Sequence, residues 1–159
     1  MPNDDRAMLR HTLATLAYRG GKTMRDAPEG FATFRAGPGS RTAGEILAHV
    51  GDLMDWALQL ADGRHVFHEA TPQPWPQEVA RFFAAVQALD ARLTEPAPLG
   101  STPEKMFQGP IADALTHIGQ IALLRRLAGA AVRGENYYKA TIEAGRVGAE
   151  QAAPNYEFD

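Results

Sequence analysis

The stretch from Gly109 to Gly129 places the strongest constraint on the fold of this chain. Pro110 suits the first turn of a helix, where a missing N–H costs nothing, and Gly129 suits a left-handed helix end. These residues predict one helix of about five turns that stops at Gly129. Helical spacing places Asp113 and His117 in one polar row between apolar flanks. Such a row needs a partner, which is a metal ion, the row's own side chains or another buried segment.

Apolar residues at helical spacing predict three further long helices. Asn3 is a suitable N-cap for the first, and Gly20-Gly21 leaves its end open, either at these glycines or a turn later. Thr42 and Glu45 have the spacing of a capping box, so they start the second. The predicted ranges are about 4–20 or 4–25, 43–62 and 76–95.

The remaining segments carry weaker patterns. One helical turn is expected over residues 101–107, and Asn136 is placed to cap a short helix over residues 137–143. Residues 148–159 are expected to form an irregular tail, and no strand pattern is found. We therefore predict an all-α fold, a four-helix bundle with an extra short C-terminal helix, as a single domain over residues 1–159.

Charge and cysteine content exclude several classes of function. The formal net charge of −3 gives no basic surface for nucleic acid, so no nucleic-acid partner is expected. The chain has 0 cysteines, so a metal site has only nitrogen and oxygen ligands. The N-terminus lacks the pattern of a signal peptide and no apolar run reaches membrane-spanning length. We therefore expect a cytoplasmic protein with no membrane partner.

Three side chains form the candidate metal site. Asp113 and His117 lie one turn apart, but this pair alone also fits a helix-start acid bonded to a core histidine. Bundles build metal sites from inward side chains on facing helices, and His49 on the second helix supplies a third candidate ligand. Two imidazoles and one carboxylate leave coordination positions open. We expect zinc or nickel there, with iron and manganese as alternatives.

Other polar and aromatic residues have weaker functional interpretations. Trp56 follows His49 by two helical turns, so it either lines a cleft or belongs to the core. Asp52 is expected to be a solvated acid or a group that holds the His49 ring. We expect surface or structural roles for the remaining histidines, which are His11, His65 and His68.

One face of the predicted fourth helix suggests self-association. Once Asp113 and His117 point inward, an apolar face remains on the other side of this helix. It carries Ile111, Leu115, Ile118 and Ala122. A helix that is apolar nearly all round is central or lies against a second subunit, so we expect a homodimer.

Two sequence segments resemble the DinB-like superfamily. These are Thr42-Ala43-Gly44-Glu45-Ile46-Leu47-Ala48-His49, followed by Trp56, and Asp113-Ala114-Leu115-Thr116-His117-Ile118-Gly119-Gln120. The superfamily includes bacillithiol transferases and, more remotely, mycothiol-dependent maleylpyruvate isomerases. The resemblance implies a four-helix bundle, often dimeric, that holds a divalent metal ion with three inward histidines.

Transferred residue by residue, the resemblance makes His49, Asp113 and His117 the metal ligands. Two positions depart from the family pattern, which commonly has histidine in place of Asp113 and arginine in place of Ile118. Aspartate remains a suitable ligand for the same metals.

The sequence leaves two classes of function open. The first is a metal-dependent enzyme, either a hydrolase or a transferase that uses a low-molecular-weight thiol as cofactor, acting on a small-molecule substrate. The second is a non-catalytic helical interaction module with a degenerate metal site. Neither the substrate nor the reaction follows from the residues.

Overall fold

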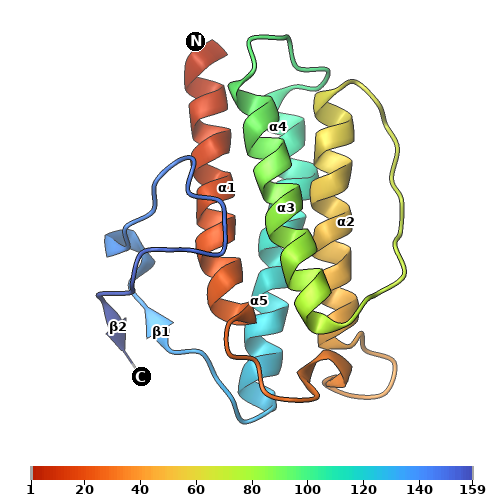
Figure 1. Ribbon diagram of the computed structural model, residues 1–159, viewed down its shortest axis with the longest axis vertical. Coiled ribbons are helices and arrows are strands. Elements are labelled where there is room, and N and C mark those ends of the chain that lie inside the picture. Colours follow the sequence, from red (N-terminus) through yellow and green to blue (C-terminus); the bar gives the residue numbers. More distant parts are fainter. Residues whose placement is uncertain (1, 159) are drawn as a thin grey trace.

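Four long helical segments run side by side along one axis in the computed structural model, which describes residues 2–158 (Figure 1). They are α1 (Pro2–Met24), α2 (Ala43–Ala61), α3 (Trp75–Thr94) and α5 (Ala112–Leu127), the last preceded by the short α4 (Pro103–Met106). Followed along the chain, α1 descends, α2 and α3 both ascend, and α5 descends (Figure 1). The link from α2 to α3, residues 62–74, therefore runs back along the whole bundle as a long crossover. The predicted four-helix bundle is confirmed.

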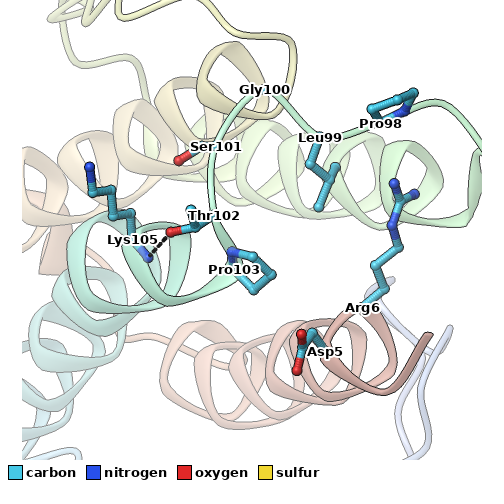
Figure 2. Close-up of a pocket in the computed structure, with 9 residues that line it drawn as sticks. All are labelled: Asp5, Arg6, Pro98, Leu99, Gly100, Ser101, Thr102, Pro103 and Lys105. Carbon is cyan, nitrogen blue, oxygen red and sulfur yellow. Dashed lines mark hydrogen bonds between the residues drawn. The ribbon is translucent and has the colours of Figure 1, made fainter. Parts of the chain in front are cut away.

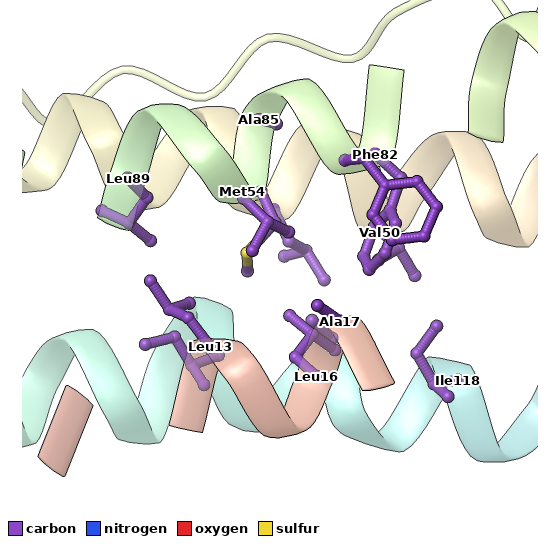
Figure 3. Close-up of a cluster of buried hydrophobic side chains, with 14 of the residues drawn as sticks. Leu13, Leu16, Ala17, Val50, Met54, Phe82, Ala85, Leu89 and Ile118 are labelled. Carbon is purple, nitrogen blue, oxygen red and sulfur yellow. The ribbon is translucent and has the colours of Figure 1, made fainter. Parts of the chain in front are cut away.

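Side chains from all four long helices meet in the core (Figure 3). Helix α2 packs against α3 and α5, and α1 packs against the same two helices. The most fully buried side chains include Leu13 and Leu16 from α1, Met54 from α2, and Phe82 and Leu89 from α3. This core fixes the mutual position of α2 and α5, the two helices that carry the candidate ligands.

The helix boundaries follow from local signals. Thr42 caps α2 by accepting a hydrogen bond from the Glu45 N–H at 3.1 Å, as the capping box predicted. Helix α1 continues through Gly20 and Gly21 to Met24, which settles its open end. A Cβ atom on Gly20 would lie 2.9 Å from Cζ of Phe82, so this glycine lets α3 approach α1 closely.

The predicted start of the fourth helix at Pro110 is wrong. Helical backbone begins at Pro103, directly after the N-cap Thr102, and continues without a break into α5. The Thr102 hydroxyl accepts a hydrogen bond from the Lys105 N–H at 3.3 Å. Pro110 lies inside a π-helical turn, Phe107–Ile111, that joins α4 to α5. Proline has no N–H to donate to the preceding turn, and a widened turn accommodates this loss. The predicted left-handed end at Gly129 is confirmed by its φ of 78°.

The prediction for the C-terminal segment is partly wrong. Instead of a helix over residues 137–143, the structure has a single 3₁₀ turn, Tyr137–Lys139, without a side-chain cap from Asn136. Two short strands that the sequence did not indicate, β1 (Gly134–Glu135) and β2 (Glu157–Phe158), pair antiparallel. The tail is therefore tied to the segment that follows α5.

The apolar face proposed for a dimer is occupied by the bundle itself. Ile111 and Ile118 are buried in the core, Leu115 packs against it, and Ala122 is half-buried. This face is thus not left over for a partner, and the homodimer stays a prediction without it. Among residues 2–158, no helix combines the length and the apolar character needed to cross a bilayer.

Candidate metal centre

The three predicted ligands come together between α2 and α5. His49 projects from α2 and Asp113 and His117 project from α5, and one potential ligand atom from each lies within 4.8 Å of the others. The His49 Nε2 atom is 3.4 Å from Asp113 Oδ2, and the two imidazole ring centroids are 4.6 Å apart. The packing of α2 on α5 thus converts a sequence separation of 64 residues into a cluster.

The helix backbone orients the His117 ring. Its Nδ1 atom lies 2.7 Å from the backbone carbonyl oxygen of Asp113, one turn earlier. A carbonyl oxygen only accepts, so Nδ1 carries the proton and Nε2 keeps its lone pair. Metal-binding histidines commonly donate their second N–H to a carbonyl in this way. We assign this tautomer from the hydrogen-bond geometry.

The donor set fits a divalent transition-metal ion. Two imidazoles and one carboxylate are ligands for zinc, nickel, iron and manganese, and three protein ligands leave positions open for a substrate. The side chains of His49 and His117 are 20% and 13% exposed, whereas that of Asp113 is 45% exposed. The cluster therefore lies at the edge of the bundle, with its carboxylate side accessible from solvent.

The crossover between α2 and α3 places aromatic rings beside the cluster. The Phe67 ring centroid is 6.2 Å from that of His49 and 5.9 Å from that of Trp56. His65, as expected, is exposed, and its ring lies 5.8 Å from Trp56. Phe67 was not among the predicted site residues, although it is the one Phe, Tyr or Trp between Trp56 and Trp75. That isolation in a polar, proline-containing loop was the available signal.

Trp56 both packs against the core and lines a cavity, the two alternatives that the sequence left open. The side chain is partly buried and packs against the core cluster. It also lines a cavity of about 380 Å³ between the end of α2, the crossover and the π-helical turn. A second cavity, of about 300 Å³, is lined by His49 together with Arg41 and Glu45. The candidate ligands thus lie near two hollows in the surface.

Neither interpretation of Asp52 is correct. Its side chain is 2% exposed, so it is not a solvated acid, and it does not hold the His49 ring. Instead it accepts a hydrogen bond from Arg81 Nη2 at 2.5 Å, and its two oxygens each lie 3.3 Å from the Ala70 N–H. Arg81 also donates to Asp55 and to the Ala48 carbonyl. This cluster ties α3 and the crossover to α2 just above His49.

A buried acid beside Arg81 was also missed. Glu78 is 2% exposed, and within residues 2–158 its Oε2 atom has no hydrogen-bond partner. Burial raises the pKa of Glu78, an effect opposed by Arg81 and reinforced by the negative charge of Asp52. The acid lies on the first turns of α3 and does not belong to the group of three candidate ligands.

A larger cavity lies elsewhere, at the end of the bundle where α1 begins (Figure 2). It measures about 770 Å³ and contains none of the three candidate ligands. Its guanidinium group, Arg6, donates hydrogen bonds to the carbonyl oxygens of Leu93, Glu95 and Ala97. Arg6 thus fixes the loop after α3, and the cavity offers no comparable cluster of reactive groups.

Comparison with known proteins adds no relative to this description. No protein family, curated protein or solved structure matches the chain.

Proposed function

We propose that this chain is a DinB-like protein that binds one divalent transition-metal ion through His49, Asp113 and His117 and acts on a small molecule there. The observation that carries the proposal is the convergence of three ligand atoms from two facing helices within 4.8 Å. The sequence motifs that resemble the DinB-like superfamily give independent support, because they contain the same three residues.

The chain's own residues prepare the site for such a reaction. The Asp113 carbonyl fixes the His117 ring, and the packing of α2 on α5 fixes His49 opposite it. Phe67 and Trp56 supply apolar rings on one side of the ligands. When bound, a divalent ion supplies Lewis acidity toward an oxygen or sulfur atom of a substrate. This chemistry serves a hydrolase as well as a thiol transferase.

The first prediction concerns metal content. Protein purified without a histidine tag and refilled with zinc or nickel should contain one ion per chain by elemental analysis. His117→Ala removes an oriented ligand and should leave substoichiometric metal. The control is His11→Ala, which deletes an exposed imidazole from α1 and should bind like the wild type.

Metal should also stabilise the fold. A ligand that binds the folded chain alone, at 100 times its dissociation constant, raises the free energy of unfolding by about 2.7 kcal/mol. Substoichiometric metal in the refilled wild type would reject the proposal. The chain would then fit the alternative class, a helical module without metal chemistry.

A further inference from the structure

The cavity beside Trp56 is lined by positive and polar groups. Arg64 and His65 come from the crossover, Ser101 and Lys105 from the start of the last helical segment, and Gly109 from its π-helical turn. The lining contains no carboxylate side chain. The cavity therefore combines an aromatic wall with two formal positive charges.

The two positive charges of the cavity differ in how far they are already paired. Within residues 2–158 the Lys105 ammonium forms no ion pair. Arg64 is held by Gln59 Oε1 at 2.7 Å and by Asp62 at 3.3 Å. Asp62 is shared, since Arg92 approaches it at 2.7 Å. Arg92 also lies 3.7 Å from Glu95, so two carboxylates face the two guanidinium groups, and Lys105 adds a further positive charge.

Glycine contacts fix the shape of the cavity. A Cβ atom on Gly100 would lie 2.2 Å from the Gly63 nitrogen, so the two backbones touch, and the Gly100 N–H donates to the Ala61 carbonyl at 2.9 Å. This crossing forms one end of the cavity. Figure 2 shows Ser101 and Lys105 on the opposite side of the Gly100–Thr102 segment from Arg6. Both residues also line the large cavity at the bundle end, so they lie between the two cavities.

The cavity lies within reach of the candidate ligands. Trp56 follows His49 by two turns of α2, a rise of about 10 Å. Phe67 lies between them, with its ring centroid about equally far from the imidazole and the indole. On α5, Asp113 follows Gly109 of the cavity lining by one turn. A small molecule of about ten ångströms thus spans both places.

We propose that this cavity binds an oxyanion group, such as a carboxylate or phosphate, on a small molecule with a flat apolar body. Lys105 and Arg64 pair with the oxyanion, and the Trp56 indole packs against the apolar body. The other end of that molecule would then reach past Phe67 to the ligand cluster, and this part of the inference rests on the proposed function. Binding of the oxyanion group is independent of the proposed function, because no cavity residue is a candidate metal ligand.

The test is a titration of metal-free protein with phenyl phosphate, followed through the indole N–H signals in NMR spectra. The chain has 2 tryptophans, and Trp75→Phe assigns the two signals. The Trp56 signal should shift and saturate while the Trp75 signal stays in place. Benzyl alcohol, which has the ring without the charge, should shift the Trp56 signal far less.

Charge variants separate the cavity from general attraction to the protein. Lys105→Met should weaken binding about fivefold, the size expected for a solvent-accessible ion pair. Lys139→Met removes the same charge from the C-terminal segment and should leave the affinity unchanged. A stationary Trp56 signal, or equal losses in the two lysine variants, would overturn the inference.

The two proposals fail separately. Lys105→Met should keep the metal content of the wild type, because Lys105 is outside the ligand cluster. A wild-type chain that binds the metal ion but not the oxyanion removes only the cavity proposal. Normal oxyanion binding in a chain that takes up no metal removes only the metal proposal.

Discussion

At His117, one carbonyl oxygen decides which ring nitrogen is left for a metal ion. The i, i+4 spacing of Asp113 and His117 places carboxylate and imidazole on one helix face, and it also brings the Asp113 carbonyl within 2.7 Å of Nδ1. Aspartate thus contributes twice, through its side chain as a ligand and through its backbone as the group that orients the neighbouring ligand. Any residue at position 113 has a backbone carbonyl that can orient His117, but only an acidic side chain there supplies a carboxylate ligand.

Burial of Glu78 makes the stability of the folded chain depend on pH. Its pKa is raised because burial disfavours the carboxylate, so the folded chain keeps this proton to a higher pH than the unfolded chain, whose carboxyl titrates near 4.5. Stability therefore falls as the pH rises from the unfolded pKa through the folded pKa. Glu78→Gln removes the charge and should raise the free energy of unfolding at pH 7 by about 1 to 2 kcal/mol.

The pH dependence distinguishes this charge effect from a change in packing. Urea unfolding of both proteins should show the advantage of Glu78→Gln shrinking below pH 4.5, where Glu78 is protonated in both states. Glu29→Gln, an exposed acid in the loop after α1, is the control and should change little at any pH. An advantage that is the same at acid and neutral pH would contradict the charge explanation.

At the scale of elements, two adjacent glycines in α1 have different roles. A Cβ atom on Gly20 would lie 2.9 Å from Phe82 and 3.3 Å from Ile118, whereas one on Gly21 would lie 3.4 Å from Phe83. Gly20→Ala should therefore cost about 1 to 3 kcal/mol of stability through overpacking. Gly21→Ala should be neutral or stabilising by up to about 1 kcal/mol, because alanine favours helix.

Denaturant midpoints of the two alanine variants measure this difference. Both variants gain the same helix propensity, so their comparison isolates the contact between α1 and α3. Equal stability of the two would mean that α3 withdraws from Gly20 without cost. It would remove the close approach as the reason for a glycine there.

Local signals predicted the elements better than the links between them. Thr42, Gly129 and the apolar spacing act within one helix, so the sequence alone sufficed for α2 and for the end of α5. Pro110 fits a helix start and a π-helical turn equally well, and packing decides between them. The sequence around Asp52 is compatible with a solvated acid, and only the contact with Arg81 of α3 shows that this side chain is buried. Contacts between elements therefore account for the errors at the site.

At the scale of the whole molecule, the crossover determines what surrounds the candidate ligands. Because α2 and α3 both ascend, residues 62–74 must return along the bundle (Figure 1). The ring contacts of Phe67 show that this segment passes beside His49 and Trp56. The helical pattern says nothing about the direction of successive helices, so this cover was not predictable. It brings Phe67 to the ligands and Arg64 to the cavity.

The C-terminal segment is held on α1 by a buried ion pair. The Glu135 side chain is 0% exposed, and it accepts hydrogen bonds from Lys22 Nζ at 2.7 Å and from the Tyr18 hydroxyl. Lys22 also pairs with Glu157 of β2 at 2.9 Å, so one ammonium joins α1 to both strands. Burial and the Glu135 hydrogen bond raise the pKa of Tyr18, which keeps this hydroxyl a donor at neutral pH.

Removing the cation should release this segment before the bundle unfolds. Lys22→Met leaves the Glu135 charge buried without its cationic partner. This should lower the stability of the docked C-terminal segment by about 3 to 5 kcal/mol. Arg133→Met, which deletes the exposed second partner of Glu157, should leave the urea midpoint unchanged. Hydrogen exchange should then show faster exchange of the amides of residues 134–158 in Lys22→Met, while the α2 and α5 amides keep their protection. If the amides of α2 and α5 lose protection together with that segment, the C-terminal segment is an integral part of the bundle. Its docking would then also support the helices that carry the candidate ligands.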